Sequence, residues 1–182
     1  MKFTKTKIKE AWIIEPKVFR DYRGFFSETW NQNDFSELIG IDTKFVQMNH
    51  SKSKINVLRG LHYQCNNPQA KLVWCTSGYV LDVFVDLRKD SSTFGKWDSV
   101  VIGGQTRLYV PKGCAHGFLV KSPEADFHYL VDEYRFPEYE RTLMWNDPDL
   151  NIDWDVVDQP ILSDKDKQGH SFKDYLDNLK KL

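Results

Sequence analysis

Short runs of alternating apolar and polar residues fill the middle of the chain, with the period of two that a β-strand requires. The runs are rich in β-branched and aromatic residues, and turns such as Ser77-Gly78 and Gly103-Gly104 separate several of them. Many short strands joined by turns are typical of an all-β sandwich or barrel. The predicted strands span residues 44–48, 56–64, 71–75, 79–87, 98–102, 107–110, 117–120 and 127–132.

Two segments near the ends of the chain have helical spacing instead. Asp34 and Glu37 are spaced as a capping box, so a first helix is predicted to start after Asn33 or Asp34 and to stop at Gly40. A second helix is predicted from about Ser171. Its apolar stripe consists of Phe172, Tyr175, Leu176 and Leu179. The sequence therefore predicts a double-sheet jelly roll with short N-terminal and C-terminal helices.

Composition narrows the possible classes of protein. A chain of 182 residues with 41% hydrophobic content is expected to form one domain over residues 1–182 with a substantial core. The net charge of -1 provides no overall field to gather nucleic acid or an anionic membrane surface. Residues 1–10 contain no apolar run, and no later stretch approaches the roughly 18 apolar residues of a spanning helix, so neither export nor membrane insertion is expected.

The cysteines point to a reducing compartment. Cys65, Cys75 and Cys114 are odd in number and form no C-x-x-C pair, which argues against a disulfide framework and a zinc knuckle. We therefore expect a cytoplasmic protein.

Residues 59–64, Arg-Gly-Leu-His-Tyr-Gln, form the densest polar cluster. In an unbroken strand Arg59 and His62 would face opposite sides, because side chains alternate. Gly60 offers a way for both to reach one site, since a strand glycine often marks a bulge or a close backbone approach. A histidine in a strand is more often structural than catalytic, so His62 alone does not identify an active site.

For other polar residues in predicted strands, the sequence allows two locations. Lys71 shares a strand face with Val73 and Cys75, so its amine lies either in an apolar cavity or at the wet end of the strand. Asp82 and Asp86 share one face of the strand over residues 79–87, which is either solvated or lines a polar lumen.

Two strand histidines, His62 and His116, raise the question of a metal ion. The position two after His62 is Gln64, and no carboxylate follows it within several residues. Such a site would lack the ligands that a stable metal centre needs, so we predict no metal and no cofactor.

Further polar residues of the C-terminal half are first interpreted as structural or surface residues. Tyr129 alternates with Phe127 and Val131, a pattern more typical of core than of catalysis. His128 and His170 are predicted to be surface or packing residues, and the segment 162–166 is predicted to be a charged, solvated turn.

Together these segments closely resemble the dTDP-4-dehydrorhamnose 3,5-epimerase family, cupin enzymes of dTDP-L-rhamnose synthesis. Each fragment is weak, but their order and coverage make chance similarity remote. The resemblance rests on residues 21–28 (DYRGFFSE), 45–51 (FVQMNHS), 57–64 (VLRGLHYQ), 85–88 (VDLR), 93–97 (TFGKW), 113–118 (GCAHGF) and 145–148 (WNDP).

This resemblance implies a cupin-type jelly roll that epimerises C3 and C5 of dTDP-4-keto-6-deoxy-D-glucose without a cofactor. In the family pattern His62 is the base and Tyr129 returns a proton to the opposite face of the ring. Lys71 holds the developing charge on the oxygen at C4, with His116 close by. Asp166 fixes the tautomer of His62. The resemblance also implies a homodimer, with the N-terminal segment as the exchanged or cross-packed element.

The remaining matches are substrate-binding positions. Met48 stands where the family commonly has aspartate, which weakens the expectation for base recognition. Tyr134 is a rival to Tyr129 as the acid, although the apolar neighbours of Tyr129 favour an inward position, and Asp82 is an alternative to Asp166 behind the base. The binding positions are Arg23, Arg59 and Lys165 around the diphosphate and sugar, and Glu28, Gln47, Asn49 and Glu140 around the base and ribose.

Three alternatives stay open from the sequence. The first is an epimerase that inverts only C3 or only C5 of a related nucleotide-linked 4-keto sugar, using the same histidine and tyrosine. The second is a metal-dependent cupin oxygenase or isomerase. The third is a cupin sugar-binding module without turnover.

Overall fold

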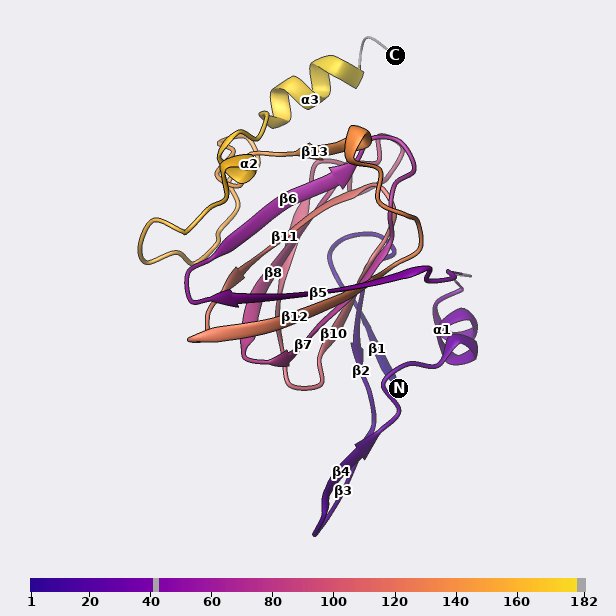
Figure 1. Ribbon diagram of the computed structural model, residues 1–182. Coiled ribbons are helices and arrows are strands. Elements are labelled where there is room, and N and C mark those ends of the chain that lie inside the picture. The colour runs from indigo at the N-terminus through magenta and orange to yellow at the C-terminus, as the bar shows by residue number, and fades with distance from the viewer. Residues whose placement is uncertain (41–42, 180–182) are drawn as a thin grey trace.

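The computed structural model describes residues 1–40 and 43–179 of the chain. Two antiparallel sheets of six and five strands face each other, and a separate two-stranded hairpin projects from the body (Figure 1). The six-stranded sheet has the order β1 (Lys2–Lys5), β2 (Trp12–Glu15), β10 (Arg107–Val110), β7 (Lys71–Ser77), β12 (Glu124–Val131) and β5 (Gln47–Lys54). The five-stranded sheet has the order β13 (Glu140–Thr142), β6 (Leu58–Gln64), β11 (Cys114–Val120), β8 (Tyr79–Asp86) and β9 (Trp97–Gly103).

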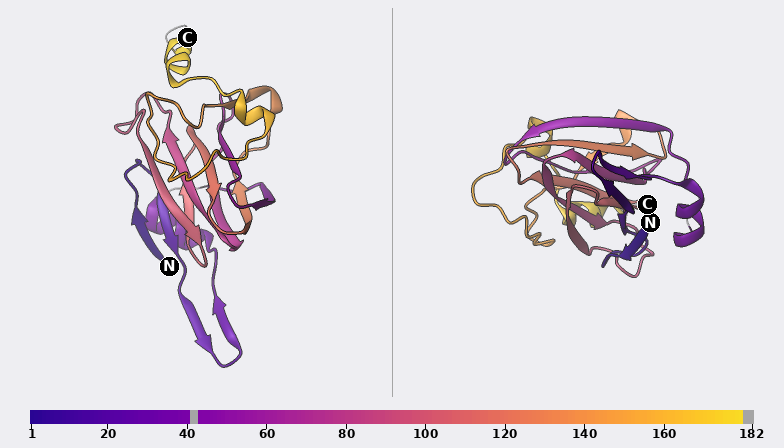
Figure 2. Two further views of the ribbon diagram at one scale, coloured as in Figure 1. Left: turned by 90° about the vertical axis from the view of Figure 1, so that its left-hand side faces the viewer. Right: turned by 90° about the horizontal axis from the view of Figure 1, so that it is seen from below.

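The remaining elements lie outside the two large sheets. The hairpin consists of β3 (Val18–Asp21) and β4 (Gly24–Ser27), and it extends beyond the end of β2 in Figure 1 and in the left view of Figure 2. The helices are α1 (Gln32–Ile39), α2 (Asp164–Lys167) and α3 (Phe172–Leu179), with a short 3-10 turn η1 (Pro137–Tyr139). No helix in the described part of the chain is long and apolar enough to cross a membrane.

Three apolar clusters hold these layers together. The first lies between the sheets, where Val73, Leu108 and Phe127 of one sheet meet Phe84 and Ile102 of the other. Because inward and outward residues alternate along each strand, the same strands supply this core and a polar surface elsewhere. The inter-sheet space also has a polar region, lined by residues of β5, β6 and β7.

The outer faces of the sheets carry the other two clusters. On the five-stranded sheet, Leu61 and Leu119 pack against Trp154 and Phe172 of the C-terminal segment. On the six-stranded sheet, Phe35 of α1 covers Leu72 and Tyr109. The C-terminal segment thus lies against the sheet that contains β6.

The structure confirms the predicted all-β sandwich and corrects several element boundaries. Strand β5 occupies residues 47–54 rather than the predicted 44–48. Its sequence QMNHSKSK is polar on both faces, so it carries no apolar signal by which to find it. Strand β11 begins at Cys114, earlier than predicted, and strands β1 to β4 and β13 were not predicted.

The predicted helix boundaries are correct in part. Helix α1 is capped by Asn31, whose side chain accepts hydrogen bonds from the backbone of Asn33 and Asp34, so the capping box expected at Asp34 is wrong. Gly40 ends the helix in the left-handed conformation with φ of 67°, as predicted. The segment 162–166, predicted to be a solvated turn, instead contains the start of α2 and the buried Asp166.

Candidate active site

A cavity of about 210 Å³ opens between the two sheets. Strands β5, β7 and β12 of one sheet form one wall, and β6 and β11 of the other form the opposite wall. Most of the predicted site residues line this cavity: Gln47, Asn49, Arg59, His62, Lys71, His116, Tyr129 and Glu140.

A backbone irregularity brings Arg59 and His62 to the same cavity. Gly60 has φ of 126°, and a Cβ added there would lie 2.6 Å from the Cα of Gly117 on the neighbouring strand. The register between β6 and β11 also shifts at this point. The predicted irregularity at Gly60 is therefore confirmed, and it explains how two residues of opposite expected orientation share one site.

His62 is tied to a carboxylate from a distant part of the chain. Its Nε2 lies 2.5 Å from Oδ1 of Asp166, which is buried within the four-residue helix α2. Asp166 also accepts hydrogen bonds from the hydroxyl of Ser163 at 2.6 Å and from the backbone N–H of Gly60 at 3.3 Å. Burial raises the pKa of Asp166, but these hydrogen bonds outweigh it and hold the pKa below its usual value. The carboxylate is therefore ionised and fixes one imidazole nitrogen, which leaves Nδ1 to exchange a proton.

The alternative prediction, that Asp82 is the partner of His62, is wrong. Both carboxylate oxygens of Asp82 lie 2.9 Å from Nε2 of His116, and the side chain is fully buried. Burial raises the pKa of Asp82, while the contact with His116 opposes that shift. The site thus contains two separate imidazole–carboxylate pairs, and in the register of β6 and β11 His62 lies opposite His116.

Lys71 lies in the cavity wall and not at a wet strand end. It is 9% exposed, and its side chain makes no hydrogen bond or ion pair with any described residue. Burial lowers the pKa of Lys71, partly offset by the negative charge of nearby Asp82. An unpaired amine in such a cavity is placed to interact with an anionic oxygen of a ligand.

Tyr129 faces the cavity from β12, on the wall opposite β6. Burial raises the pKa of Tyr129, so its phenol stays protonated at neutral pH. Tyr134, the rival acid, is 58% exposed and is not among the residues that line the cavity. Of the two tyrosines, Tyr129 alone lies where a proton can be delivered into the cavity.

A charged cluster forms one rim of the cavity. Glu140 accepts two hydrogen bonds from Arg135 at 2.9 Å and one from Lys165 at 2.9 Å. These contacts, that with Arg135 foremost, lower the pKa of Glu140 to about 2. Arg135 was not predicted, because it lies in an irregular segment after β12 where periodicity carries no information. Lys165 reaches the rim through Glu140 rather than lining the cavity itself.

Strand β5 supplies a second polar group to the cavity. Gln47 and Asn49 point inward and are joined by a hydrogen bond of 2.8 Å. Met48, between them, is 57% exposed on the outer face of the sheet. The departure from the family pattern at Met48 therefore lies outside the cavity of this chain.

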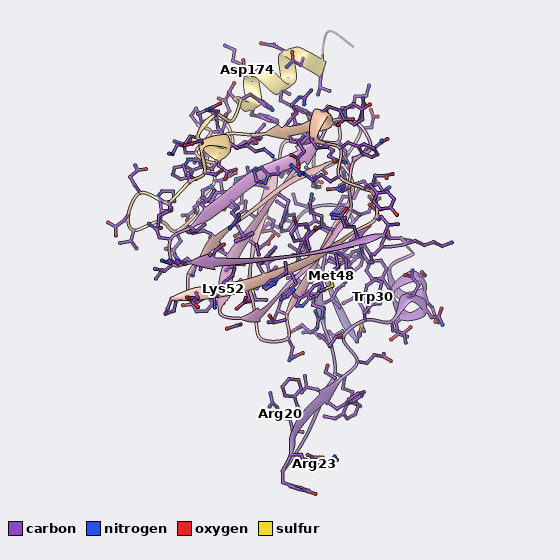
Figure 3. The ribbon with its side chains drawn as sticks, in the orientation of Figure 1. Arg20, Arg23, Trp30, Met48, Lys52 and Asp174 are labelled. Carbon is purple, nitrogen blue, oxygen red and sulfur yellow. The ribbon has the colours of Figure 1, made fainter. Side chains whose placement is uncertain are left out.

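Two predicted site residues do not lie in the cavity. Arg23 occupies the tip of the projecting hairpin, where it pairs with Asp21 at 2.5 Å (Figure 3). Glu28 follows the hairpin and accepts a hydrogen bond from Asn31 at 3.4 Å. The expectation that both residues bind substrate is therefore not met within a single chain.

No group of three or more His, Cys, Asp or Glu side chains in the described ranges is placed to hold a metal ion. His50 and His128 stack on each other on the outer face of the six-stranded sheet, and His170 accepts or donates a hydrogen bond at the hydroxyl of Tyr63. His128 and His170 are thus packing residues, as predicted.

The sequence model of the dTDP-4-dehydrorhamnose 3,5-epimerases matches residues 5–174 of the chain. The chain belongs to this epimerase family. The epimerase of Pseudomonas aeruginosa is 48% identical over 176 residues, which cover 96% of this chain and 97% of the relative. The sandwich described above is accordingly the cupin jelly roll of this family.

Two solved epimerase structures are informative for the site. A 3,5-epimerase from Legionella pneumophila, crystallised with dTDP-4-keto-L-rhamnose, has a TM-score of 0.92 and 44% identity, covering 98% of this chain and 95% of that chain. A 3'-monoepimerase from Streptomyces bikiniensis, crystallised with dTDP-quinovose, has a TM-score of 0.88 and 33% identity, covering 97% and 90%. The fold is therefore shared by double and single epimerases, with higher identity to the double epimerases.

Proposed function

We propose that this enzyme epimerises dTDP-4-keto-6-deoxy-D-glucose at C3 and C5 to dTDP-4-keto-L-rhamnose, a step of dTDP-L-rhamnose biosynthesis. The observation that carries the proposal is the placement of the His62–Asp166 pair and Tyr129 on opposite walls of one cavity. Inversion at carbon requires a base on one face of the ring and an acid on the other. The Legionella pneumophila structure with dTDP-4-keto-L-rhamnose supports the choice of substrate class.

The reaction begins with proton transfer from carbon to His62. The C–H electron pair moves into the ring to form an enolate, and the negative charge develops on the oxygen at C4. Asp166 stabilises the imidazolium that results, because its ionised carboxylate is held against Nε2 at 2.5 Å. Lys71, with His116 nearby, is placed to stabilise the enolate oxygen by charge and hydrogen bonding.

The second half of the step delivers a proton to the opposite face. Tyr129 donates its phenolic proton to the same carbon, the enolate collapses to the ketone, and the configuration is inverted. Burial keeps the phenol of Tyr129 protonated before the reaction. The phenolate and the imidazolium then return to their starting states by exchanging protons with water. The same cycle serves the carbon on the other side of the ketone, and it requires no cofactor.

Substrate binding involves the charged and amide groups around the cavity. Arg59 and Arg135 supply guanidinium groups suited to the diphosphate, and Lys165 adds a cation at the rim. Gln47 and Asn49 supply amides that suit the base or ribose. Glu140 orients Arg135 and Lys165 through its hydrogen bonds.

We also infer that the enzyme is a homodimer in which the hairpin β3–β4 of one copy completes the cavity of the other. Arg23 and Glu28 match substrate-binding positions of the family, yet neither reaches the cavity of its own chain. The hairpin exposes a set of aromatic side chains that need a surface to cover them. These are Phe19, Tyr22, Phe25 and Phe26.

We also infer the cellular location and partners of the enzyme from its cysteines and its net charge. A cytoplasmic enzyme with no nucleic-acid or membrane partner is consistent with the free thiols of Cys65, Cys75 and Cys114 and with the net charge of -1. We infer that residues 1–182 act as one catalytic domain.

A single-centre epimerase is the second candidate, favoured by the fold shared with the Streptomyces bikiniensis 3'-monoepimerase. Incubating the enzyme with dTDP-4-keto-6-deoxyglucose in heavy water and recording NMR spectra separates the two. Deuterium at both C3 and C5 is expected, and deuterium at one carbon alone would exclude the double epimerase. Coupling the reaction to a 4-keto reductase with NADPH then identifies the product sugar.

A further inference from the structure

The side chain of Gln64 is held beside the cavity by three hydrogen bonds to backbone atoms. Its amide nitrogen donates to the carbonyls of Asn67 at 2.7 Å and Tyr134 at 3.3 Å, and its amide oxygen accepts from the backbone N–H of Phe136 at 2.7 Å. The residue is only 6% exposed. Both amide donors and the acceptor oxygen are therefore engaged within the chain, and no donor is left for a ligand.

Gln64 lies on the same strand as the base but serves another part of the site. It is two residues from His62, so both side chains point to the same face of β6. His62 is bonded to Asp166, whereas the partners of Gln64 belong to two loops. The residue at this position thus links β6 to the chain that follows β12.

The segment between β12 and η1 has no regular secondary structure to hold it. Within the described residues, no backbone-to-backbone hydrogen bond involves Glu133, Tyr134 or Arg135. Side chains take over this task. Gln64 bonds to the residues on either side of Arg135, and the side-chain amide of Gln69 donates to the carbonyl of Glu133 at 2.8 Å. The backbone at Arg135 is therefore fixed by Gln64 through both neighbours.

Arg135 extends from this segment to the rim of the cavity. Its Nε and Nη2 each donate to one oxygen of Glu140 at 2.9 Å. Glu140 lies directly opposite Gln64 in the register of β13 and β6. The third nitrogen of the guanidinium, Nη1, forms no hydrogen bond with any residue of the described ranges. Gln64 thus holds the backbone of Arg135, Glu140 holds its guanidinium, and Nη1 is left for an anionic ligand.

We propose that Gln64 is a positioning residue for Arg135, acting by fixing the backbone on both sides of it. The inference rests on the proposed function, in which the guanidinium of Arg135 binds the diphosphate of the nucleotide sugar. A long side chain on an unfixed segment loses conformational entropy when it binds, whereas a prepositioned one loses less. Gln64 therefore contributes to substrate affinity without contacting the substrate.

A role for Gln64 through the base would give different kinetics. Displacement of His62 lowers kcat, because the reacting atoms lose their alignment. Strand β6 is paired on both sides, with β11 and with β13, and His62 is bonded to Asp166 independently of Gln64. We therefore expect the loss of the Gln64 amide to weaken nucleotide binding and to leave kcat nearly unchanged.

Binding of dTDP to the Gln64→Met variant tests this expectation. Methionine has about the length of glutamine but does not form these hydrogen bonds. The Kd of dTDP, measured by titration calorimetry, is expected to rise about threefold to tenfold in Gln64→Met and about tenfold or more in Arg135→Met, the lower range for a hydrogen bond to a charged group. Because dTDP carries the diphosphate but no hexose, the measurement does not depend on epimerase activity.

The double variant shows whether Gln64 acts through Arg135. Once the guanidinium is removed, fixing the backbone beside it no longer affects the diphosphate. Gln64→Met is therefore expected to change the Kd of dTDP by less than about twofold when Arg135→Met is already present. Equal fold-changes in the two backgrounds overturn the inference.

Ser122→Ala is the matched control, because Ser122 holds a turn far from the site in the same manner. Its hydroxyl accepts from the backbone N–H of Tyr79 at 2.9 Å and donates to the carbonyl of Glu124 at 2.5 Å. Ser122 is 5% exposed and does not line the cavity. Its loss is expected to lower the stability of the fold without changing the Kd of dTDP. An equal rise in Kd in Ser122→Ala and Gln64→Met attributes the effect to general loosening and overturns the inference.

The other outcomes separate this inference from the proposed function. An unchanged Kd in Gln64→Met, or a fall in kcat without a change in Kd, overturns the inference. An unchanged Kd in Arg135→Met also overturns it, because Arg135 then does not bind the diphosphate. A wild-type enzyme that binds dTDP without epimerising the sugar overturns the proposed function alone. If Gln64→Met does not fold, Gln64→Glu replaces it with the same expected rise in Kd, because the carboxylate still accepts from Phe136 but has no donor for Tyr134.

Discussion

His62 and Asp166 are 104 residues apart in the chain, yet Nε2 of one lies 2.5 Å from Oδ1 of the other. One belongs to a strand that lines the cavity and the other to a four-residue helix in the C-terminal segment. The C-terminal segment packs against the five-stranded sheet and so brings the carboxylate behind the imidazole. This pair is the feature on which the proposed proton transfer depends.

Removal of the base is the most direct test of that chemistry. His62→Ala is expected to lower kcat at least about a hundredfold, the low end for a positioned general base, while affinity for the nucleotide sugar changes little. His50→Ala is a matched control, because His50 lies on the outer face of the sheet. Wild-type turnover by His62→Ala would contradict the proposed mechanism and support a binding module or a different base.

Tyr129→Phe separates proton removal from inversion. Without the phenol, His62 still removes the proton and returns one to the same face, so deuterium from heavy water is expected to enter with retained configuration. The rate of inversion is expected to fall at least about a hundredfold. Tyr134→Phe serves as the control, since Tyr134 is exposed. Inversion that survives in Tyr129→Phe but not in Tyr134→Phe would reverse the assignment of the acid.

Mixed dimers test whether the hairpin acts on the neighbouring cavity. Arg23→Ala and His62→Ala are each expected to be nearly inactive as homodimers. In the mixed dimer, the intact hairpin of the His62→Ala copy completes the intact cavity of the Arg23→Ala copy, so activity returns at one site. Activity assays after mixing, unfolding and refolding the two variants together measure this recovery. Absence of recovery in verified mixed dimers would place Arg23 outside the neighbouring site.

The hydrogen bonds of Glu140 are expected to contribute to the stability of the folded protein in a pH-dependent way. Its hydrogen bonds with Arg135 and Lys165 lower its folded pKa to about 2, below the usual value near 4.3 in unfolded chains. The contribution is therefore fully present above the unfolded pKa and is lost as pH falls through the folded pKa. The unfolding free energy of wild type minus Glu140→Gln, measured in urea, is expected to shrink between about pH 5 and pH 3. A difference that stays constant over this interval would show that the charge of Glu140 is not responsible.

Gly60→Ala tests the backbone irregularity beneath the base. The positive φ disfavours any side chain, and the added Cβ meets the Cα of Gly117 at 2.6 Å. We expect a loss of about 2 kcal/mol or more in unfolding free energy, together with reduced kcat because His62 shifts. Gly104→Ala is the control: it too has a positive φ, but no atom lies within 4 Å of the added Cβ. Equal destabilisation in the two variants would show that the contact with Gly117 is unimportant.

Local pattern was sufficient for much of the fold. Strands β7, β8 and β10 alternate apolar and polar residues or carry β-branched runs, and they form where the pattern predicts. Strand β5 shows where this reasoning stops, because both of its faces are polar: one lines the cavity and the other lies on the outer surface. A hydrophobic signal exists only for strands that bury an apolar face.

The sequence by itself determined the all-β class, the positions of most central strands and, through family resemblance, many of the residues that line the cavity. The sequence already favoured Asp166 over Asp82 and an irregularity at Gly60, and the tertiary structure bears out both. Only the tertiary structure decided that Asp82 pairs with His116 and that Arg23 lies outside the cavity of its own chain. The physical reason is that spacing along a chain sets which way neighbouring side chains point. Which distant groups meet depends on how whole sheets and segments pack.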